Sequence, residues 1–173
     1  MPFESEKNKV PKGSKKIWIE AYGCSANMAD SEMISGLLKK DGYEIATDEK
    51  ESALNIIVTC SVKDVTQHRM LYRIEKLSKS IKPLIVAGCL PKTERQLIES
   101  LNPFASLLGP HSIDKTLDVV HSALFGKKSI RLENSISDKL NLPRTRINPI
   151  IGIIEISSGC MSECTFCQTK LAK

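Results

Sequence analysis

The sequence lacks any long run of apolar residues. Across its 173 residues no stretch approaches the roughly 18 consecutive apolar residues that a membrane span requires. The first sixteen residues mix acidic and basic side chains and contain no apolar segment of the kind found in secretion signals. We therefore expect a cytoplasmic, globular protein without a membrane partner, in which thiols stay reduced and available to bind metals.

The residues needed for a complete zinc site are also missing. Beside the Cys164-x2-Cys167 pair there is no second C-x2-C pair and no H-x3-H pair, and His68, His111 and His121 have no metal-ligand spacing. An even cysteine count is compatible with disulfides in a secreted chain, but nothing in this sequence indicates secretion. Iron–sulfur chemistry is therefore favoured over both structural zinc and disulfides.

What the chain does have is six cysteines in two groups of three. The dispersed set is Cys24, Cys60 and Cys89, and the compact set is Cys160, Cys164 and Cys167. The compact set has C-x3-C-x2-C spacing, so that three thiolates can converge from one loop. Because an iron–sulfur cube that only carries electrons takes four cysteines, three cysteines leave one iron open for chemistry.

Charge alone says little about partners. Twenty-five Lys and Arg against 20 Asp and Glu give a net charge of +5, which is weak support for nucleic-acid binding. Basic residues gather in the first sixteen positions and again at Lys127, Lys128, Arg131, Arg144 and Arg146. Such clusters are more often solvated tails and linkers than binding surfaces.

Short apolar runs alternate with longer amphipathic ones. Runs typical of buried strands cover residues 17–22, 54–59, 84–88 and 105–108, and helical spacing of apolar residues covers 30–40, 62–79, 91–101 and 113–125. This alternation predicts an α/β domain with a parallel sheet and flanking helices, either Rossmann-like or flavodoxin-like. No G-x-G-x-x-G follows a strand, so the sequence does not support dinucleotide binding.

The predicted fold would bring the dispersed cysteines close together. Cys24, Cys60 and Cys89 each follow one of the first three predicted strands, and the carboxyl ends of parallel strands line the ligand crevice of such sheets. A single free cysteine is often just a small buried hydrophobic residue. Three at equivalent strand ends indicate instead that they meet at one edge.

The chain divides into four predicted segments. Residues 1–15 form a charged tail, 16–126 the α/β domain, 127–149 a polar linker with two prolines, and 150–173 the start of a (β/α) barrel. In the last segment a strand at 150–157 leads directly into the compact set. Because a (β/α) barrel needs roughly 200 residues or more, we expect this chain to be a fragment, inactive on its own.

The ordered cysteine motifs resemble one enzyme family. C-x3-C-x2-C after the first strand of a barrel resembles the radical S-adenosylmethionine enzymes. Around the dispersed set, the motifs are similar to the amino-terminal domain of the methylthiotransferases: residues 22–27 (YGCSAN), 30–32 (DSE), 58–63 (VTCSVK) and 87–92 (AGCLPK). Residues 69–71 (RML), 105–110 (ASLLGP) and 142–149 (LPRTRINP) resemble the archaeal and eukaryotic branch.

The resemblance implies a substrate, two cofactors and two ligand sets. That branch methylthiolates N6-threonylcarbamoyladenosine at position 37 of tRNA, on C2 of the purine. The compact set would hold a [4Fe–4S] cluster whose open iron binds S-adenosylmethionine and cleaves it to a radical. The dispersed set would hold an auxiliary [4Fe–4S] cluster that presents sulfur, and a reductant protein and a sulfur source would be further partners. Catalytic residues beyond these ligands are not assigned.

Two other functions stay open at this point. One is the related branch that methylthiolates a ribosomal protein, which the branch-specific residues disfavour. The other is a non-catalytic iron–sulfur or zinc protein. Iron content would separate the two methylthiotransferase branches from the non-catalytic protein, because either branch requires two clusters in the full-length protein, whereas zinc would support the non-catalytic protein.

Overall fold

The computed structural model describes residues 16–61, 64–134 and 139–173, and the tail predicted at 1–15 lies outside this part. A six-stranded sheet contains β1 (Lys16–Ala21), β2 (Glu44–Ile45), β3 (Leu54–Thr59), β4 (Leu84–Gly88), β5 (Ser106–Leu108) and β6 (Ile130–Arg131). The α-helices are α1 (Ser25–Lys40), α2 (Asp64–Ser78), α3 (Leu90–Thr93), α4 (Arg95–Leu101), α5 (Thr116–Leu124) and α6 (Gln168–Ala172). Short 3-10 turns are η1 (Glu49–Glu51), η2 (Ile113–Lys115) and η3 (Lys139–Asn141). Of the helices in the described part, none is long and apolar enough to cross a membrane.

The strand order identifies the place where a ligand is expected. All neighbouring strands are parallel, in the order β2-β1-β3-β4-β5-β6. The chain leaves β1 for β2 on one side and then returns to β3 on the other. This is the flavodoxin-like order, and such sheets bind ligands beyond the strand ends where the direction reverses. That point lies between β1 and β3.

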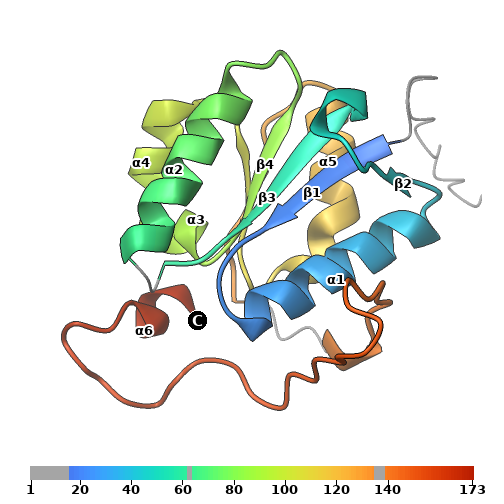
Figure 1. The fold of residues 1–173 in the computed structure, drawn as a ribbon. Helices are drawn as coiled ribbons and strands as arrows, with labels where there is room; N and C mark the ends of the chain where they lie inside the picture. The colour runs from blue at the N-terminus through green and yellow to red at the C-terminus, as the bar shows by residue number, and fades with distance from the viewer. Residues whose placement is uncertain (1–15, 62–63, 135–138) are drawn as a thin grey trace, which may run out of the picture.

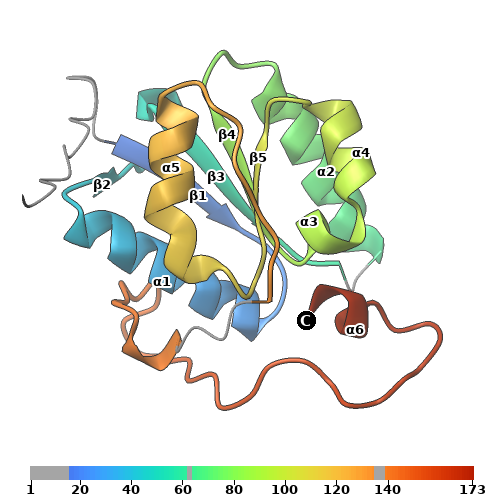
Figure 2. The same ribbon diagram turned by 180° about the vertical axis from the view of Figure 1, so that it is seen from behind.

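Helices cover both faces of the sheet (Figures 1 and 2). Helices α1 and α5 lie on one face, and α2, α3 and α4 lie on the other. The central strand β3 is buried at every position, as expected for a parallel strand with both faces covered. One apolar cluster joins the sheet to α1 and α5 through residues such as Met33 and Val119, and a second joins it to α2 and α4 through Ile74 and Ile98.

The predicted fold class is confirmed, with differences at helix boundaries. The helix expected over 91–101 is two helices, because Glu94 leaves helical geometry with φ −132° and ψ 39°. The helix expected over 113–125 begins with the 3-10 turn η2. Strands β2 and β6 were not predicted, because two residues are too short to show an apolar period.

The strand predicted at residues 150–157 is wrong. This segment pairs with no strand in the described residues and is mostly exposed, with Ile150 at 90% and Ile156 at 91%. A strand is defined by hydrogen bonds to a neighbour, and its apolar side chains supply no partner for its backbone. That residues 150–173 begin a barrel stays a prediction.

The predicted linker at 127–149 takes part in the fold. Its first part adds β6 beside β5, with Leu107 opposite Ile130. Its last part lies against α1, visible as the orange segment in Figure 1. The division of the chain into four segments otherwise stays a prediction.

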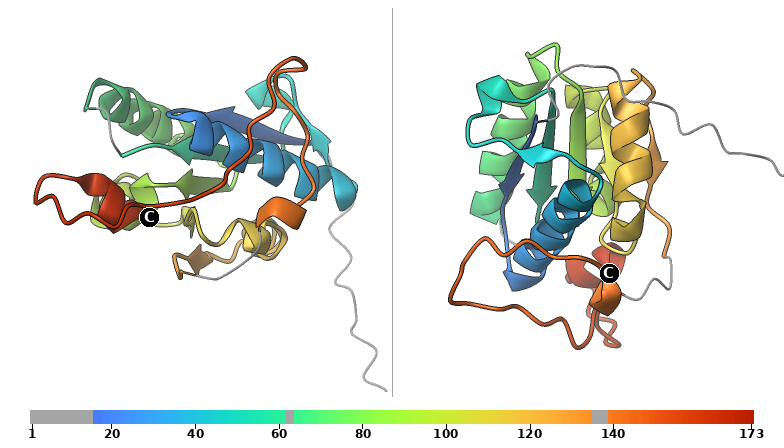
Figure 3. Two further views of the ribbon diagram at one scale, coloured as in Figure 1. Left: turned by 90° about the horizontal axis from the view of Figure 1, so that it is seen from below. Right: turned by 90° about the vertical axis from the view of Figure 1, so that its right-hand side faces the viewer.

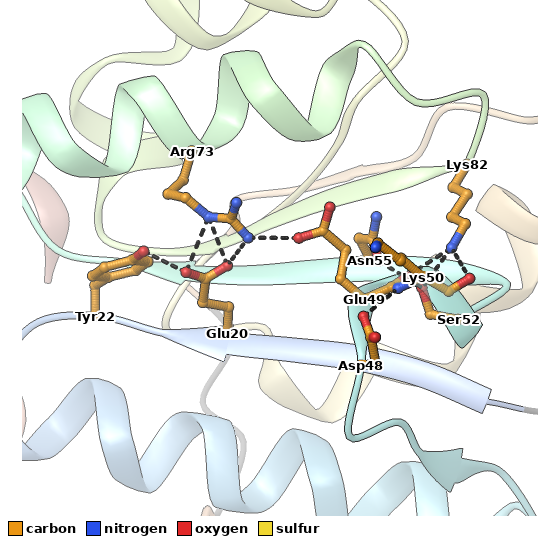
Figure 4. Close-up of polar contacts among 9 residues, drawn as sticks. All are labelled: Glu20, Tyr22, Asp48, Glu49, Lys50, Ser52, Asn55, Arg73 and Lys82. Atoms are coloured by element: carbon orange, nitrogen blue, oxygen red, sulfur yellow. Dashed lines mark hydrogen bonds and ion pairs between the residues drawn. The ribbon is translucent and has the colours of Figure 1, made fainter.

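One ion-pair network joins β1 and η1 to helix α2 (Figure 4). Arg73 of α2 donates from Nε to both carboxylate oxygens of Glu20 on β1, and its Nη2 donates to Glu20 at 2.6 Å and to Glu49 at 2.8 Å. Tyr22 also donates its hydroxyl to Glu20. Burial by itself raises the pKa of Glu20, but the hydrogen bonds from Arg73 and Tyr22 outweigh it and lower the pKa below 4.5.

Arg73→Ala should lower the free energy of unfolding by about 1–3 kcal/mol at pH 7, because it removes the charged partner of a half-buried carboxylate. The lowered pKa of Glu20 stabilises the fold above the pKa of the unfolded chain, and this contribution disappears as pH falls. The difference between wild type and variant in urea unfolding should therefore shrink below pH 4.5. Lys79→Ala, which removes an exposed pair with Glu75, should change stability by less than about 0.5 kcal/mol.

Candidate metal centre

The dispersed cysteines lie around one cavity at the carboxyl edge of the sheet. The cavity has a volume of about 250 Å³. From the α/β domain it is lined by Cys24, Asn27, Cys60 and Cys89, and from the carboxyl-terminal segment by Ser157, Ser158, Gly159, Thr169, Ala172 and Lys173. Because Cys24 follows β1 and Cys60 follows β3, the cavity lies at the point where the strand order reverses.

Two glycines bring the strand ends close enough for this arrangement. Gly23 and Gly88 directly precede Cys24 and Cys89, with φ of +113° and +92°. A Cβ on Gly23 would lie 2.5 Å from Cβ of Cys60, and one on Gly88 would lie 3.0 Å from the backbone nitrogen of Thr59 and closer still to its carbonyl oxygen. The chain therefore turns toward the cavity at positions where a side chain would be both strained and blocked.

Thr59 connects all three cysteines. Its carbonyl oxygen accepts a hydrogen bond from the backbone N–H of Cys89 at 2.9 Å and another from Nδ2 of Asn27. The amide oxygen of Asn27 in turn accepts a hydrogen bond from the thiol of Cys24 at 3.0 Å. Cys60 follows Thr59 in the chain, so one buried residue sets the positions of all three.

The three thiols differ in their surroundings. Cys60 and Cys89 are 3% and 4% exposed, whereas Cys24 is exposed. Burial raises the pKa of Cys89 to about 11, opposed by the charge of Lys173 and reinforced by Cys60, Asp30 and Cys24. Cys89 is therefore a protonated thiol at neutral pH, and a metal that binds it must displace the proton.

The donor set fits an iron–sulfur cluster. Three thiols line one cavity, and iron–sulfur clusters are bound in proteins by cysteine thiolates. In the free protein, the described residues contain no group of three or more His, Cys, Asp or Glu side chains already arranged around a metal ion.

The compact set lies outside the cavity but next to it. Cys160 and Cys164 are exposed, and Ser162 contacts both sulfurs, its backbone N–H donating to Cys160 at 3.4 Å and its hydroxyl lying 3.4 Å from Cys164. Cys167 precedes α6, where hydrogen bonds from the side chain and backbone of Thr169 lower its pKa. Residues just before and after this loop line the cavity, although its own cysteines do not.

Helix α6 holds the loop near the sheet edge (Figure 3). Ala172 is 1% exposed, and the carbonyl oxygen of Lys173 is 3.1 Å from Nε2 of His111. Figure 3 shows the loop returning to α6 on the side of the α/β domain where the strands end. The structure thus brings both cysteine sets to one edge of the sheet and keeps them as separate groups.

A protein-family model matches residues 16–109, which is more than half of the chain, and its description is "Uncharacterized protein family UPF0004". The chain belongs to this family. The match covers β1 through β5 and includes Cys24, Cys60 and Cys89.

Curated relatives of this UPF0004 chain carry consistent names. It is 37% identical over 161 residues to the "Probable threonylcarbamoyladenosine tRNA methylthiotransferase" of Pyrococcus abyssi, covering 91% of this chain and 37% of that protein. It is 32% identical over 186 residues to the human "Threonylcarbamoyladenosine tRNA methylthiotransferase", covering 99% of this chain and 31% of that protein. The chain therefore spans about a third of the length of these relatives, and the family expected from the motifs is confirmed.

Asn27 and Thr59 were not predicted as site residues of this UPF0004 chain. Both belong to motifs around the dispersed set, but the sequence assigns them no role. Asn27 lies three residues after Cys24 in α1 and is 1% exposed. Spacing of one helical turn from a candidate ligand, combined with an amide in an apolar surrounding, is the pattern that could have identified it.

Gly23→Ala and Gly88→Ala should each destabilise the fold and prevent metal binding at the cavity. Gly42→Ala is the matched control, because Gly42 also has a positive φ of +87° but has nothing within 4 Å of an added Cβ. In the control, the free energy of unfolding should fall by about 1–2 kcal/mol, the cost of placing alanine in a left-handed backbone conformation. In the two site variants, it should fall by about 1–3 kcal/mol more, because the added Cβ overpacks the site. Equal losses of stability and of iron in all three variants would contradict the packing described here.

Proposed function

We propose that this chain is the amino-terminal part of a methylthiotransferase that acts on N6-threonylcarbamoyladenosine at position 37 of tRNA, placing the methylthio group on C2. The observation that carries the proposal is the convergence of three thiols from three separate strand ends on one cavity. An iron–sulfur cluster is bound in proteins by such thiolates. The names of relatives at 32–37% identity support the substrate.

The dispersed set would hold an auxiliary [4Fe–4S] cluster, and the compact set a second one that binds S-adenosylmethionine. Bound in these places, the two clusters would supply the sulfur and the radical chemistry that a purine C2–H requires, since acid–base groups cannot activate it. A tRNA, a reductant protein and a source of sulfur would be the partners. The cytoplasm, where thiols remain reduced, is the matching location.

The residues of this chain would prepare and shield the auxiliary site. Asn27 and the carbonyl of Thr59 hold Cys24 and Cys89 in place before a metal arrives. Burial of Cys60 and Cys89 keeps water from two of the three ligands. Cys24 is exposed, and Ser157, Ser158 and Gly159, which also line the cavity, lead in sequence to the compact set. At its exposed ligand, a cluster held by the dispersed set could meet the radical chemistry of the compact set.

The branch acting on a ribosomal protein and the non-catalytic metal protein have weaker support. The relatives named above all carry tRNA names. A zinc site would need a fourth protein ligand beside the three thiols, and the sequence offers no second C-x2-C or H-x3-H pair.

Two cysteine variants of the full-length protein test whether the two cysteine sets have separate roles. Cys60→Ala should leave cleavage of S-adenosylmethionine to 5′-deoxyadenosine intact and lower methylthiolated nucleoside in digested tRNA by at least about 100-fold. Cys164→Ala should abolish both products, because it removes a ligand of the cluster that binds the cofactor. Mass spectrometry of the two products measures each step.

Ser61→Ala is the control, because it removes a buried hydroxyl beside Cys60 without removing a thiol. It should keep both products. Retained methylthiolation in Cys60→Ala would refute the role of the dispersed set, and loss of cofactor cleavage in the same variant would show that the two sets are not independent.

A further inference from the structure

Residues 139–153, named here the strap, cross the surface of α1 between the α/β domain and the compact set. The strap begins at η3 and ends shortly before the residues that line the cavity. The orange segment beside α1 in Figures 1 and 3 follows this path. It has little regular secondary structure of its own, so its position depends on its contacts with the helix.

An ion pair holds the start of the strap. Nζ of Lys139 is 2.6 Å from Oδ1 of Asp30, whose side chain is 1% exposed, and 3.6 Å from Oε2 of Glu155. Burial raises the pKa of Asp30 to about 6, and the charge of Lys139 only partly opposes this. The pair fixes where the strap begins, because a buried carboxylate that lost its charged partner would be left uncompensated.

Backbone hydrogen bonds hold the middle of the strap. The N–H of Thr145 donates to the carbonyl oxygen of Glu32 at 2.9 Å, and the N–H of Ile147 donates to the carboxylate of the same residue at 3.1 Å. Glu32 is 3% exposed and Ile147 is 62% exposed, so these bonds attach an exposed segment to a buried side chain of the helix. Nη1 of Arg144 donates to the carbonyl of Ile153 at 2.7 Å and closes the strap on itself.

A glycine in the middle of α1 allows this close approach. A Cβ on Gly36 would lie 2.6 Å from the backbone nitrogen of Arg144 and closer still to the carbonyl of Pro143. Glycine inside a helix costs about 0.5–1 kcal/mol relative to alanine. The helix therefore bears a local cost at the position where the strap crosses it.

Helix α1 thereby connects the two cysteine sets. Cys24 is its amino-terminal cap residue, Asn27 lies in its first turn, and Asp30, Glu32 and Gly36 follow along the same helix. Asp30 and Glu32 are buried under the strap. The strap continues into Ser157, Ser158 and Gly159, which line the cavity directly before Cys160. A shift of the strap along α1 would move the compact set relative to the dispersed one.

We propose that Asp30, Glu32 and Gly36 are positioning residues that fix the strap on α1 and so set the distance between the two cysteine sets. The inference rests on the proposed function for its catalytic meaning, since it assigns these residues to coupling one cluster with the other. The docking itself does not depend on that function. Cofactor cleavage needs only the compact set, whereas product formation needs both sets at the correct separation.

Gly36→Ala in the full-length protein tests the docking by hydrogen–deuterium exchange. The variant should lose protection at the amides of Thr145 and Ile147 by about tenfold or more, although alanine favours the helix itself. Lys40→Ala, an exposed position on the same helix, should leave both amides protected. The amide of Asn55, bonded to Pro83 in the domain core, should stay protected in every variant and report that the domain is folded.

Glu32 provides a conservative rescue. Glu32→Gln keeps an oxygen that can accept from the N–H of Ile147, so this amide should stay protected from exchange. In Glu32→Ala the protection of the same amide should fall about tenfold. Unchanged exchange at Thr145 and Ile147 in both Gly36→Ala and Glu32→Ala would overturn the inference.

Cluster spacing tests positioning rather than mere stability. Electron paramagnetic resonance on the reduced enzyme should show a narrow distribution of distances between the clusters in the wild type and in Glu32→Gln, and a broad one in Gly36→Ala and Glu32→Ala. The last two variants should also cleave about tenfold more cofactor per methylthiolated tRNA. An unchanged distance distribution despite lost protection would overturn the positioning role.

Absence of methylthiolated tRNA from the wild type would instead refute the proposed function. The exchange measurement needs no cluster, so it would still show whether the strap docks on α1.

Discussion

The carbonyl oxygen of Thr59 is the point on which the proposed metal centre depends. It accepts hydrogen bonds from the backbone of Cys89 and the side chain of Asn27, and Asn27 accepts one from Cys24. Thr59 is fully buried at the end of β3, and its hydroxyl donates to Ala87 on β4 at 2.6 Å. Three thiols from distant parts of the chain can share one cavity because this residue connects the ends of their strands.

The three candidate ligands differ in their access to solvent. Cys60 and Cys89 are buried and Cys24 is exposed, so a metal held between them would be shielded at two ligands and accessible at the third. The segment that carries the compact set also lines the cavity. Helix α1 links both parts, because it begins at Cys24 and supports the strap along Asp30, Glu32 and Gly36.

Much of this organisation follows from patterns that a sequence displays directly. Apolar runs at β3 and β4 and helical spacing in α1 predict a parallel α/β sheet, and the position of the cysteines after the strands predicts one shared edge. The strand expected at 150–157 failed because apolar composition does not supply a hydrogen-bonding neighbour. Strand β6 and the docking of the strap could not be predicted, because they depend on contacts between residues far apart in the chain, such as Thr145 and Glu32.

The central claim is that Cys24, Cys60 and Cys89 together bind one iron–sulfur cluster. The most direct measurement is the iron and sulfide content of this chain after anaerobic reconstitution, with Cys160, Cys164 and Cys167 all replaced by alanine. We expect about four irons and four sulfides per chain, with the absorption and resonance spectra of a [4Fe–4S] cluster. A folded variant that binds no iron, or that binds a single zinc ion instead, would contradict it.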